Sequence, residues 1–286
     1  MPELAVVIVN HNAGAYLLRC LRSVLERSGD VELEIVVVDN ASTDGSAEEA
    51  AAAFPQARLI RCENRGFAAG VNVGIRATSA PSVLVLNPDV EIVSGTLAEL
   101  VRLAEARPRA GVIGPRILNP DGTVYPSGRT VPSLATAVGH AFLGPVWPRN
   151  PFTRRYHLAD WDRTTERRVD WISGAAFLLR RRALEEVGPL DERFFLYAEE
   201  VDLFTRLREA GWEIVFTPSL EVVHEQGVST GRSRRMHLIH AESVYRYFEK
   251  HHAHGWRRAL LPLARLVLRA RAELVSALDR LRGAER

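Results

Sequence analysis

The sequence has few cysteines and no long hydrophobic run. Cys20 and Cys62 are the only cysteines among 286 residues, and they lie in segments that read as helix and strand. We therefore expect two buried thiols, not a disulfide framework or a cysteine metal site. No apolar run approaches the roughly 18 residues of a membrane-spanning helix. The N-terminus lacks a basic leader, and its apolar run is too short for a signal peptide. These absences favour a cytoplasmic protein.

The chain also lacks an excess of one charge. It has 37 basic and 35 acidic residues, a formal net charge of +2, so its overall field gives no reason to expect nucleic acid as a partner. The basic residues gather at the end. Residues 255–286 contain eight arginines and three acidic residues, a local charge of +5. Neither the dinucleotide-binding glycine pattern nor a P-loop occurs, which disfavours both classes of nucleotide chemistry.

Short apolar segments alternate with segments of helical period. Runs rich in valine and isoleucine predict buried strands at 4–10, 34–40, 57–62 and 82–90. Apolar residues at helical spacing predict helices near 15–27, 46–53, 71–77 and 96–107. This alternation indicates an α/β fold with an open, mostly parallel sheet flanked by helices. Between residues 118 and 165 the periodicity is lost, and we expect an irregular insertion there that covers a site.

Each predicted strand ends in polar residues. In open α/β sheets, ligands bind beyond the carboxyl ends of the strands. Turn formation and helix capping explain asparagine or aspartate at any one end, but a shared binding site explains all four ends better. The residues are Asn10, His11 and Asn12, then Asp39 and Asn40, then Asn64 and Arg65, and finally Asn87 and Asp89.

The stretch "LYAEEVDLF" at 196–204 places three carboxylates among large apolar side chains. On a helix from about 199 to 210, Glu200 projects from the apolar arc, Glu199 lies at its edge and Asp202 points to the other side. Acids in a first helical turn are also ordinary capping residues. Capping does not explain why Glu200 faces the core, where a partly desolvated carboxylate has a raised pKa and suits general-base catalysis.

Two further residues are candidates for a metal site. Asp89 follows a strand end, where a carboxylate suits a hard divalent cation that also takes phosphate oxygens. His224 follows the strand-like "LEVV", and neutral imidazole is a common metal ligand. Considered singly, the Asn-Pro-Asp sequence is more often a turn, and a lone histidine is more often structural.

The C-terminal segment predicts a basic amphipathic helix. Its apolar positions recur near helical spacing with arginines between them: Leu260, Leu263, Val267, Leu274, Leu278 and Leu281. Such a helix can lie on an anionic membrane surface, pack on the catalytic domain or pack on a second subunit of a homo-oligomer. These alternatives stay open at the level of sequence.

Six motifs, taken in order, resemble the inverting glycosyltransferases of family two, which have the GT-A fold. They are "VVIVNHNAGAYLLRCLRSV", "IVVVDNASTDGS", "NRGFAAGVNVGI", "VLVLNPDV", "WISGAAFLLRR" and "ERFFLYAEEVDLFTRLREAGW". The branch that they resemble most is that of bacterial rhamnosyltransferases using dTDP-rhamnose. The resemblance implies a GT-A domain at 1–235, with 118–165 as an acceptor-side insertion, and a helical extension at 236–286.

The resemblance also implies roles for individual residues. Those expected near the nucleotide are Asn10, Asp39, Asn40, Arg65, Gly66, Asn72 and Asn87. Asp89, in place of the family's D-x-D, and His224 would hold a divalent metal, Mg or Mn. Glu200 takes the place of the family's usual aspartate base. Trp171, Gly174, Glu199 and Asp202 would lie on the acceptor side.

The implied function is the transfer of a sugar, rhamnose in particular, from a dTDP- or UDP-sugar to a glycan or polyprenyl-linked acceptor. This would serve cell-surface polysaccharide synthesis at the inner face of the plasma membrane. A catalytically inactive nucleotide-sugar-binding or scaffold protein is one alternative, disfavoured by the intact acids at 89, 199, 200 and 202. A sugar nucleotidyltransferase is another, disfavoured because no glycine-rich basic loop follows the first strand.

Overall fold

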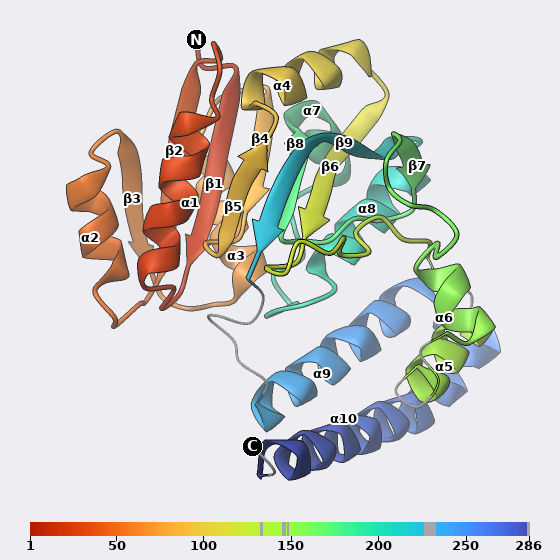
Figure 1. Cartoon of the computed structure of the whole chain (residues 1–286). Helices are drawn as coiled ribbons and strands as arrows, with labels where there is room; N and C mark the ends of the chain where they lie inside the picture. Colours follow the sequence, from red (N-terminus) through yellow and green to blue (C-terminus); the bar gives the residue numbers. More distant parts are fainter. Residues whose placement is uncertain (132–133, 145–146, 148, 226–232, 285–286) are drawn as a thin grey trace.

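A nine-stranded mixed sheet forms the centre of the molecule in a computed structural model, which describes residues 1–131, 134–144, 147, 149–225 and 233–284 (Figure 1). The main strand order is β3-β2-β1-β4-β8-β6-β9-β5, and β7 pairs with β9. The first four strands are mutually parallel, as predicted: β1 (Leu4–Asn10), β2 (Leu33–Asn40), β3 (Ala57–Cys62) and β4 (Ser82–Leu86). All of β1 is buried, which explains its apolar character on both faces.

The sheet is mixed beyond β4. The strand β8 (Ala176–Arg180) runs antiparallel to both β4 and β6 (Ala110–Leu118). The long strand β9 (Glu213–His224) is parallel to β6 and antiparallel to β5 and β7 (Arg167–Val169). A continuous parallel arrangement is therefore limited to β1, β2, β3 and β4.

The predicted strand at 82–90 is wrong in its second part. The strand β4 ends at Leu86, the chain turns through Asn87, Pro88 and Asp89, and a separate strand, β5 (Val90–Ser94), begins, which pairs with β9 at the end of the strand order. Pro88 has no N–H to donate to a strand neighbour. The apolar residues on both sides of the turn made the run read as one strand.

Helices cover both faces of the sheet and enclose two apolar cores. One face carries α1 (Ala15–Glu26), α2 (Ser46–Ala53) and α4 (Leu97–Ala106). The other face carries α3 (Phe67–Arg76), α7 (Arg181–Val187) and α8 (Glu199–Glu209). The helix α3 begins four residues before its predicted start. It lies so close to β1 that a Cβ on Gly74 would stand 2.3 Å from a methyl carbon of Val7.

The expected irregular region at 118–165 contains two short helices, α5 (Leu134–Leu143) and α6 (Pro151–Tyr156). The Asn150 side chain caps α6 by accepting the Thr153 N–H, and Pro151 occupies the first turn. Sequence reasoning missed both helices because α6 has only six residues and α5 is apolar at nearly every position, so neither shows an apolar period.

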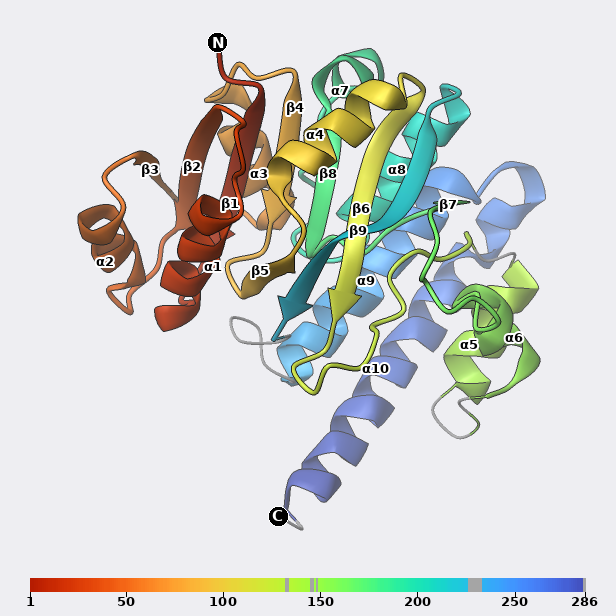
Figure 2. The same ribbon diagram turned by 45° about the horizontal axis from the view of Figure 1, so that its top comes forward.

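The C-terminal helices pass beneath the carboxyl ends of the strands (Figures 1 and 2). They are α9 (Arg234–His251) and α10 (Leu261–Ala284), joined by a 3-10 turn (Gly255–Leu260). The predicted boundary at 235/236 falls in the first turn of α9. This helix is bonded to the catalytic region: Ser243 donates to the Leu196 carbonyl at 2.8 Å, and Tyr247 pairs with Thr205 at 2.9 Å. None of the described helices is long and apolar enough to cross a membrane.

Candidate active site

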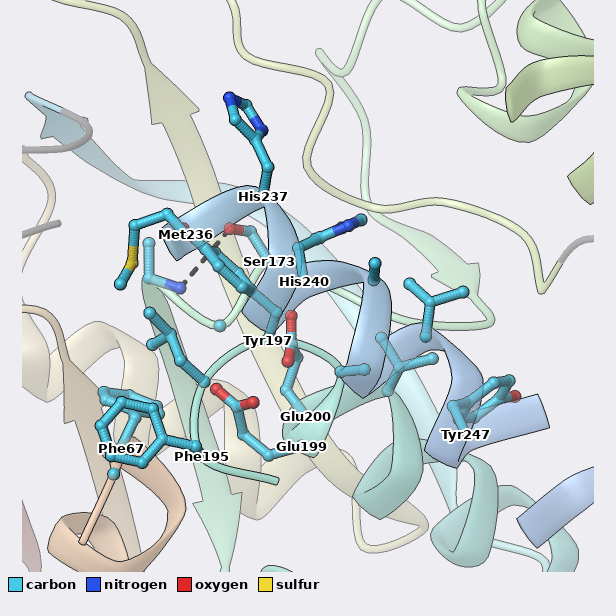
Figure 3. A pocket seen from close by; sticks show the side chains of 18 of the residues that line it. Phe67, Ser173, Phe195, Tyr197, Glu199, Glu200, Met236, His237, His240 and Tyr247 are labelled. Carbon is cyan, nitrogen blue, oxygen red and sulfur yellow. Dashed lines mark hydrogen bonds between the residues drawn. The ribbon is translucent and has the colours of Figure 1, made fainter. Parts of the chain in front are cut away.

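A cavity of about 1440 Å³ opens at the carboxyl ends of the strands, between the sheet and α9 (Figure 3). It is larger than most small-molecule pockets, so a donor and an acceptor can occupy it together. It is lined by residues predicted to contact the nucleotide, the metal or the acceptor and by the predicted base: Asn40, Gly66, Asn87, Asp89, Trp171, Gly174, Glu199, Glu200 and His224. Asn10, Asp39, Arg65, Asn72 and Asp202 are not part of this lining.

Asp89 and His224 lie side by side because their strands pair. In the β5–β9 register Val90 faces His224, and the Glu225 N–H donates to the Asp89 carbonyl at 3.2 Å. The Asp89 carboxylate lies 3.3 Å from His224 Nε2, and the Asn87 side chain lies 3.4 Å from the same nitrogen. The strand register therefore brings together the two candidate metal ligands, which are 135 positions apart in the sequence.

These side chains fit a divalent metal that also binds a diphosphate. His224 Nδ1 is buried and has no hydrogen-bond partner in the described part of the chain. Within that part no group of three or more histidine, cysteine or acidic side chains is arranged to hold a metal. Two protein ligands leave several coordination positions for phosphate oxygens and water, the arrangement typical of Mg²⁺ sites on nucleotide substrates.

Glu199 and Glu200 start α8 and point into the cavity (Figure 3). The residues before them, Tyr197 and Ala198, both have positive φ, at 70° and 65°. Such a backbone is uncommon for non-glycine residues and clusters at functional sites. No side chain caps this helix, so its first N–H groups face the carboxylates.

Burial raises the pKa of both carboxyl groups. Glu199 is 3 % exposed, and desolvation, reinforced by the charge of Glu200, holds its pKa well above that of an ordinary glutamate. Desolvation also raises the pKa of Glu200, but backbone N–H groups and Arg129 favour its ionised form. Two adjacent buried carboxyl groups resist ionising together, and the backbone N–H groups and Arg129 favour the charge on Glu200.

The wall of the cavity that was predicted to face the acceptor follows β7 in the sequence. A Cβ on Gly174 would lie 3.3 Å from the Glu200 Cδ, so the missing side chain makes room for this carboxylate. Trp171 lines the cavity and donates from its indole to the Thr130 carbonyl at 3.2 Å. Sequence reasoning missed the neighbours that complete this wall, Tyr125, Arg129 and Tyr156. They lie in the region without periodicity, where only scattered aromatic and arginine residues hinted at a site.

Asn10 and Asp39 form a buried polar network under the nucleotide end of the cavity. The Asn10 amide lies within hydrogen-bond distance of Asp39 at 3.0 Å, Ser42 at 3.0 Å and Ser46 at 2.9 Å. Asn40 does reach the cavity, and it donates to the Gly66 carbonyl at 3.1 Å. Asn10 and Asp39 thus hold the strand ends on which the cavity-lining Asn40 stands.

Asn72 and Arg65 contact the segment that leads to α8. Asn72 is buried, donates to the Leu190 carbonyl at 2.9 Å and accepts the Leu190 N–H at 3.1 Å. Arg65 forms an exposed ion pair with Glu192 at 3.1 Å. Next to them, the Phe67 N–H donates to the Phe195 carbonyl at 2.8 Å. In this structure these residues position the segment 190–198, where direct nucleotide contacts had been expected.

Asp202 also differs from its expected acceptor-side position. It is fully buried between α8 and α9, where its carboxylate contacts Arg206 at 3.0 Å, Lys250 at 2.7 Å and His251 at 2.7 Å. Burial alone would raise the pKa of Asp202, but hydrogen bonds from His251 and Lys250 and the charge of Arg206 outweigh it and lower the pKa. Sequence reasoning had correctly placed its side chain away from that of Glu200, but it did not foresee the cations of α9.

Comparison with known proteins identifies the family. The model of "Glycosyl transferase family 2" matches residues 5–188, which include β1 to β4 and the turn carrying Asp89. The chain belongs to this family. As a family 2 glycosyltransferase it is an enzyme, so the scaffold and nucleotidyltransferase alternatives are set aside.

Relatives of this family 2 glycosyltransferase include rhamnosyltransferases. It is 40 % identical over 285 residues to the N-acetylglucosaminyl-diphospho-decaprenol L-rhamnosyltransferase of Mycobacterium tuberculosis, covering 95 % of this chain and 92 % of the relative. Rhamnosyltransferase WbbL of Escherichia coli K12 is 22 % identical over 257 residues, covering 86 % of this chain and 92 % of the relative.

Solved structures agree with the GT-A fold. GalNAc-T7 with UDP, GalNAc and Mn²⁺ matches with a TM-score of 0.62 at 17 % identity, covering 87 % of this chain and 48 % of that one. The mannosyltransferase PcManGT of Pyrobaculum calidifontis, in complex with GDP-Man and Mn²⁺, matches with a TM-score of 0.57 at 19 % identity, covering 99 % and 80 %.

Proposed function

We propose that this enzyme transfers rhamnose from dTDP-rhamnose, with inversion, to an N-acetylglucosaminyl-diphospho-polyprenol acceptor. The observation that carries the proposal is the desolvated Glu200 carboxylate in a cavity that also contains Asp89 and His224. The choice of donor and acceptor rests on the 40 % identity to the mycobacterial rhamnosyltransferase over nearly the whole of both chains.

Glu200 is the general base in this proposal. Its carboxylate accepts the proton of the acceptor hydroxyl while the hydroxyl oxygen bonds to the anomeric carbon of rhamnose. The bond from that carbon to the diphosphate oxygen breaks on the opposite face, and dTDP leaves. Because attack and departure occur on opposite faces, the anomeric configuration inverts. A raised pKa suits a base that works near neutral pH.

Asp89 and His224 would hold the divalent metal, with Asn87 beside them. Bound there, the metal would offset the negative charge that develops on the departing diphosphate. Asn40 and Gly66 line the nucleotide end of the cavity, and we assign them to the donor. Asn10, Asp39, Arg65 and Asn72 support this end from the positions described above. Carboxylate, amide and imidazole donors suit Mn²⁺ and Mg²⁺ alike.

The C-terminal helix α10 would bring the enzyme to the inner face of the plasma membrane. Its exposed apolar side chains include Leu263, Leu266 and Leu274, and arginines flank them. A surface of this kind attracts anionic lipids and buries its apolar side in the interface. The enzyme would then lie at the membrane that contains its lipid-linked acceptor.

The proposal is tested by measuring dTDP release with a panel of nucleotide sugars and N-acetylglucosaminyl-diphospho-prenol, in Mn²⁺, Mg²⁺ or EDTA. We expect turnover with dTDP-rhamnose, its loss in EDTA, and its loss in Glu200→Gln. Asp89→Ala should also lose Mn²⁺ binding in a titration with dTDP present. Turnover with another sugar only, or turnover indifferent to Glu200→Gln, would refute the corresponding assignment.

A further inference from the structure

A guanidinium group without a carboxylate partner stands in the acceptor-side wall of the cavity. Arg129 donates from Nε to the Pro126 carbonyl at 2.8 Å, from Nη2 to the Tyr125 hydroxyl at 2.7 Å, and from Nη1 to the Tyr156 hydroxyl at 3.5 Å. Its central carbon lies 4.8 Å from the Trp171 ring and 5.3 and 5.5 Å from the two tyrosine rings. Among the described residues, no carboxylate forms an ion pair with it.

Burial of the Arg129 guanidinium raises the free energy of the folded protein unless an anion pairs with it. A charge taken out of water is strongly penalised when no opposite charge accompanies it. The faces of three aromatic rings offset part of that cost, but only part. The guanidinium lines the cavity, and it has the planar geometry that recognises phosphate oxygens in pairs. The cage formed by Tyr125, Tyr156 and Trp171 thus presents a cation to an occupant of the cavity.

A second cation approaches the same place from another element. Arg271, on α10, also lines the cavity. His140 lies against the Tyr156 ring, with 4.6 Å between centroids, and its pKa is lowered by burial and by the charges of Arg129 and Arg271. Both guanidinium groups therefore act on one imidazole. Two converging cations match a group with more than one negative charge.

The two cations share the cavity with the candidate base and the candidate metal ligands. Arg129 favours the ionised form of Glu200, and Asp89 and His224 line the same cavity. An apolar strip from α9 and α10 also lines the cavity: Val244, Phe248, Leu268, Ala272 and Val275. One cavity thus contains a candidate base, two cations and an apolar strip.

We propose that Arg129, assisted by Arg271, binds the diphosphate of the lipid-linked acceptor, and that the strip between α9 and α10 receives the first isoprene units. The inference rests on the proposed function, because it takes a diphospho-prenol as acceptor. It makes Arg129 a specificity-determining residue for an anionic acceptor. It also makes the C-terminal helices part of the substrate site.

The test compares two acceptors. One is N-acetylglucosaminyl diphosphate with a short isoprenoid chain, and the other is a neutral octyl N-acetylglucosaminide. Arg129→Gln should lower kcat/KM for the diphosphate acceptor by about ten- to a hundredfold, the worth of a charge-assisted hydrogen bond. At a pH above the acid limb, where Glu200 is ionised with or without Arg129, the substitution should change kcat/KM for the neutral acceptor little. Arg129→Lys should give an intermediate loss, and Arg271→Gln a smaller loss of the same kind.

Binding provides a readout that does not depend on turnover. With dTDP and Mn²⁺ saturating the donor end, farnesyl diphosphate should bind the wild type and lose about tenfold or more in affinity in Arg129→Gln. The matched control is Arg19→Gln, which removes an exposed arginine stacked 4.6 Å from the Tyr16 ring of α1, outside the cavity. It should leave both measurements unchanged. Unaltered dTDP affinity and melting temperature would show that Arg129→Gln is folded, and Arg271→Gln repeats the test if it is not.

The outcomes separate this inference from the proposed function. Equal losses with both acceptors, together with an acid limb of the pH profile moved upward, would mean that Arg129 acts through Glu200, and the inference would fail. Unchanged use of the diphosphate acceptor by both arginine variants would overturn it as well. A wild-type enzyme that transfers rhamnose only to other acceptors would instead refute the acceptor part of the proposed function.

Discussion

At the scale of single residues, the two carboxyl groups at the start of α8 differ in environment although they are chemically identical. Glu199 is the more deeply buried of the two, and its pKa is raised by burial and by Glu200. Glu200 lies against Gly174 and feels the charge of Arg129. One proton held on Glu199 relieves the repulsion between them and leaves Glu200 free to act as the base.

This assignment predicts unequal effects of the same substitution. Glu200→Gln should lower kcat by about a hundred- to ten-thousandfold, the usual worth of a positioned base. Glu199→Gln should retain most of the activity, because glutamine mimics a protonated glutamate. Steady-state kinetics on the two variants makes the comparison. A larger loss in Glu199→Gln than in Glu200→Gln would reverse the roles.

The pH dependence of kcat/KM should show the same difference between Glu199 and Glu200. Because the base must be ionised, kcat/KM should fall as the pH drops through the pKa of Glu200, and this limb should lie above the value of about 4.3 for an unperturbed glutamate. Glu199→Gln should leave the limb in place, since a protonated Glu199 adds no charge. A limb that moves down in this variant would show that Glu199 is ionised during turnover.

Residue-level prediction succeeded where a side chain is governed by its own helix or strand. The orientation of Glu200 followed from helical geometry, and Asp89 and Asn87 followed from the end of β4. The same reasoning could not find Arg129, because its position depends on an aromatic cage assembled from three separate segments. Nor could it see that Asp202 meets Lys250 and His251 of α9.

At the scale of elements, the segment that leads into α8 is fixed by close backbone contact with the start of α3. Gly66 has φ of +100°, and a Cβ there would stand 2.3 Å from the Phe195 carbonyl oxygen. Asn72 and Phe67 hold the same segment through Leu190 and Phe195. The geometry of Tyr197 and Ala198, and so the placement of both carboxylates, depends on this docking.

Gly66→Ala should therefore impair stability and catalysis together. We expect a loss of at least about 2 kcal/mol in the free energy of unfolding, from backbone strain and the contact with Phe195. We also expect a lower kcat. Gly122→Ala is the matched control, because Gly122 has a positive φ of +81° but nothing within 4 Å. The free energy of unfolding of Gly122→Ala should fall by about 1 kcal/mol, from backbone strain alone. Its activity should equal that of the wild type. Urea denaturation and turnover measure both variants.

The buried ion cluster between α8 and α9 gives a second prediction at this scale. Asp202→Asn leaves Arg206, Lys250 and His251 without their common anion, so the free energy of unfolding should fall by about 3 kcal/mol. Since folding lowers the pKa of Asp202, its contribution is complete above about pH 5 and is lost as the pH falls through the folded-state pKa. The difference between variant and wild type should shrink on acidification.

Denaturation curves at pH 7 and at pH 3 measure this dependence. Glu48→Gln is the control, because Glu48 pairs with Arg61 on the surface and both side chains are more than half exposed. It should not change the unfolding midpoint measurably. An Asp202→Asn protein as stable as the wild type at pH 7 would contradict the account of the cluster.

At the scale of the whole molecule, α10 has two apolar faces, one lining the cavity and one exposed. Leu268, Ala272 and Val275 face the cavity. Leu263 and Leu266 are 59 % and 66 % exposed, and Trp256, just before the helix, is 75 % exposed. At 100° per residue these two sets point in different directions. The sequence predicted an amphipathic helix, but it could not divide the apolar residues between an inner and an outer surface.

Removing the outer face should weaken membrane binding without disabling the chemistry. Leu263→Ser combined with Leu266→Ser should lower co-sedimentation with vesicles containing anionic lipid by roughly tenfold or more, given about 25 cal/mol per Å² of apolar surface. Binding of the wild type should also weaken with added salt. Turnover of a short-chain acceptor in solution should stay unchanged. Vesicle binding that is indifferent to both the substitutions and salt would refute this surface.

The pairing of β5 with β9 joins two candidate metal ligands that leave the ribosome at different times. Asp89 emerges from the ribosome with the first third of the chain, but His224 arrives only with the end of β9, the strand that joins β6 to β5. The nucleotide half can complete its parallel strands long before that. A growing chain therefore carries only one of the two candidate metal ligands, and not the proposed base, until Glu200 and β9 have followed.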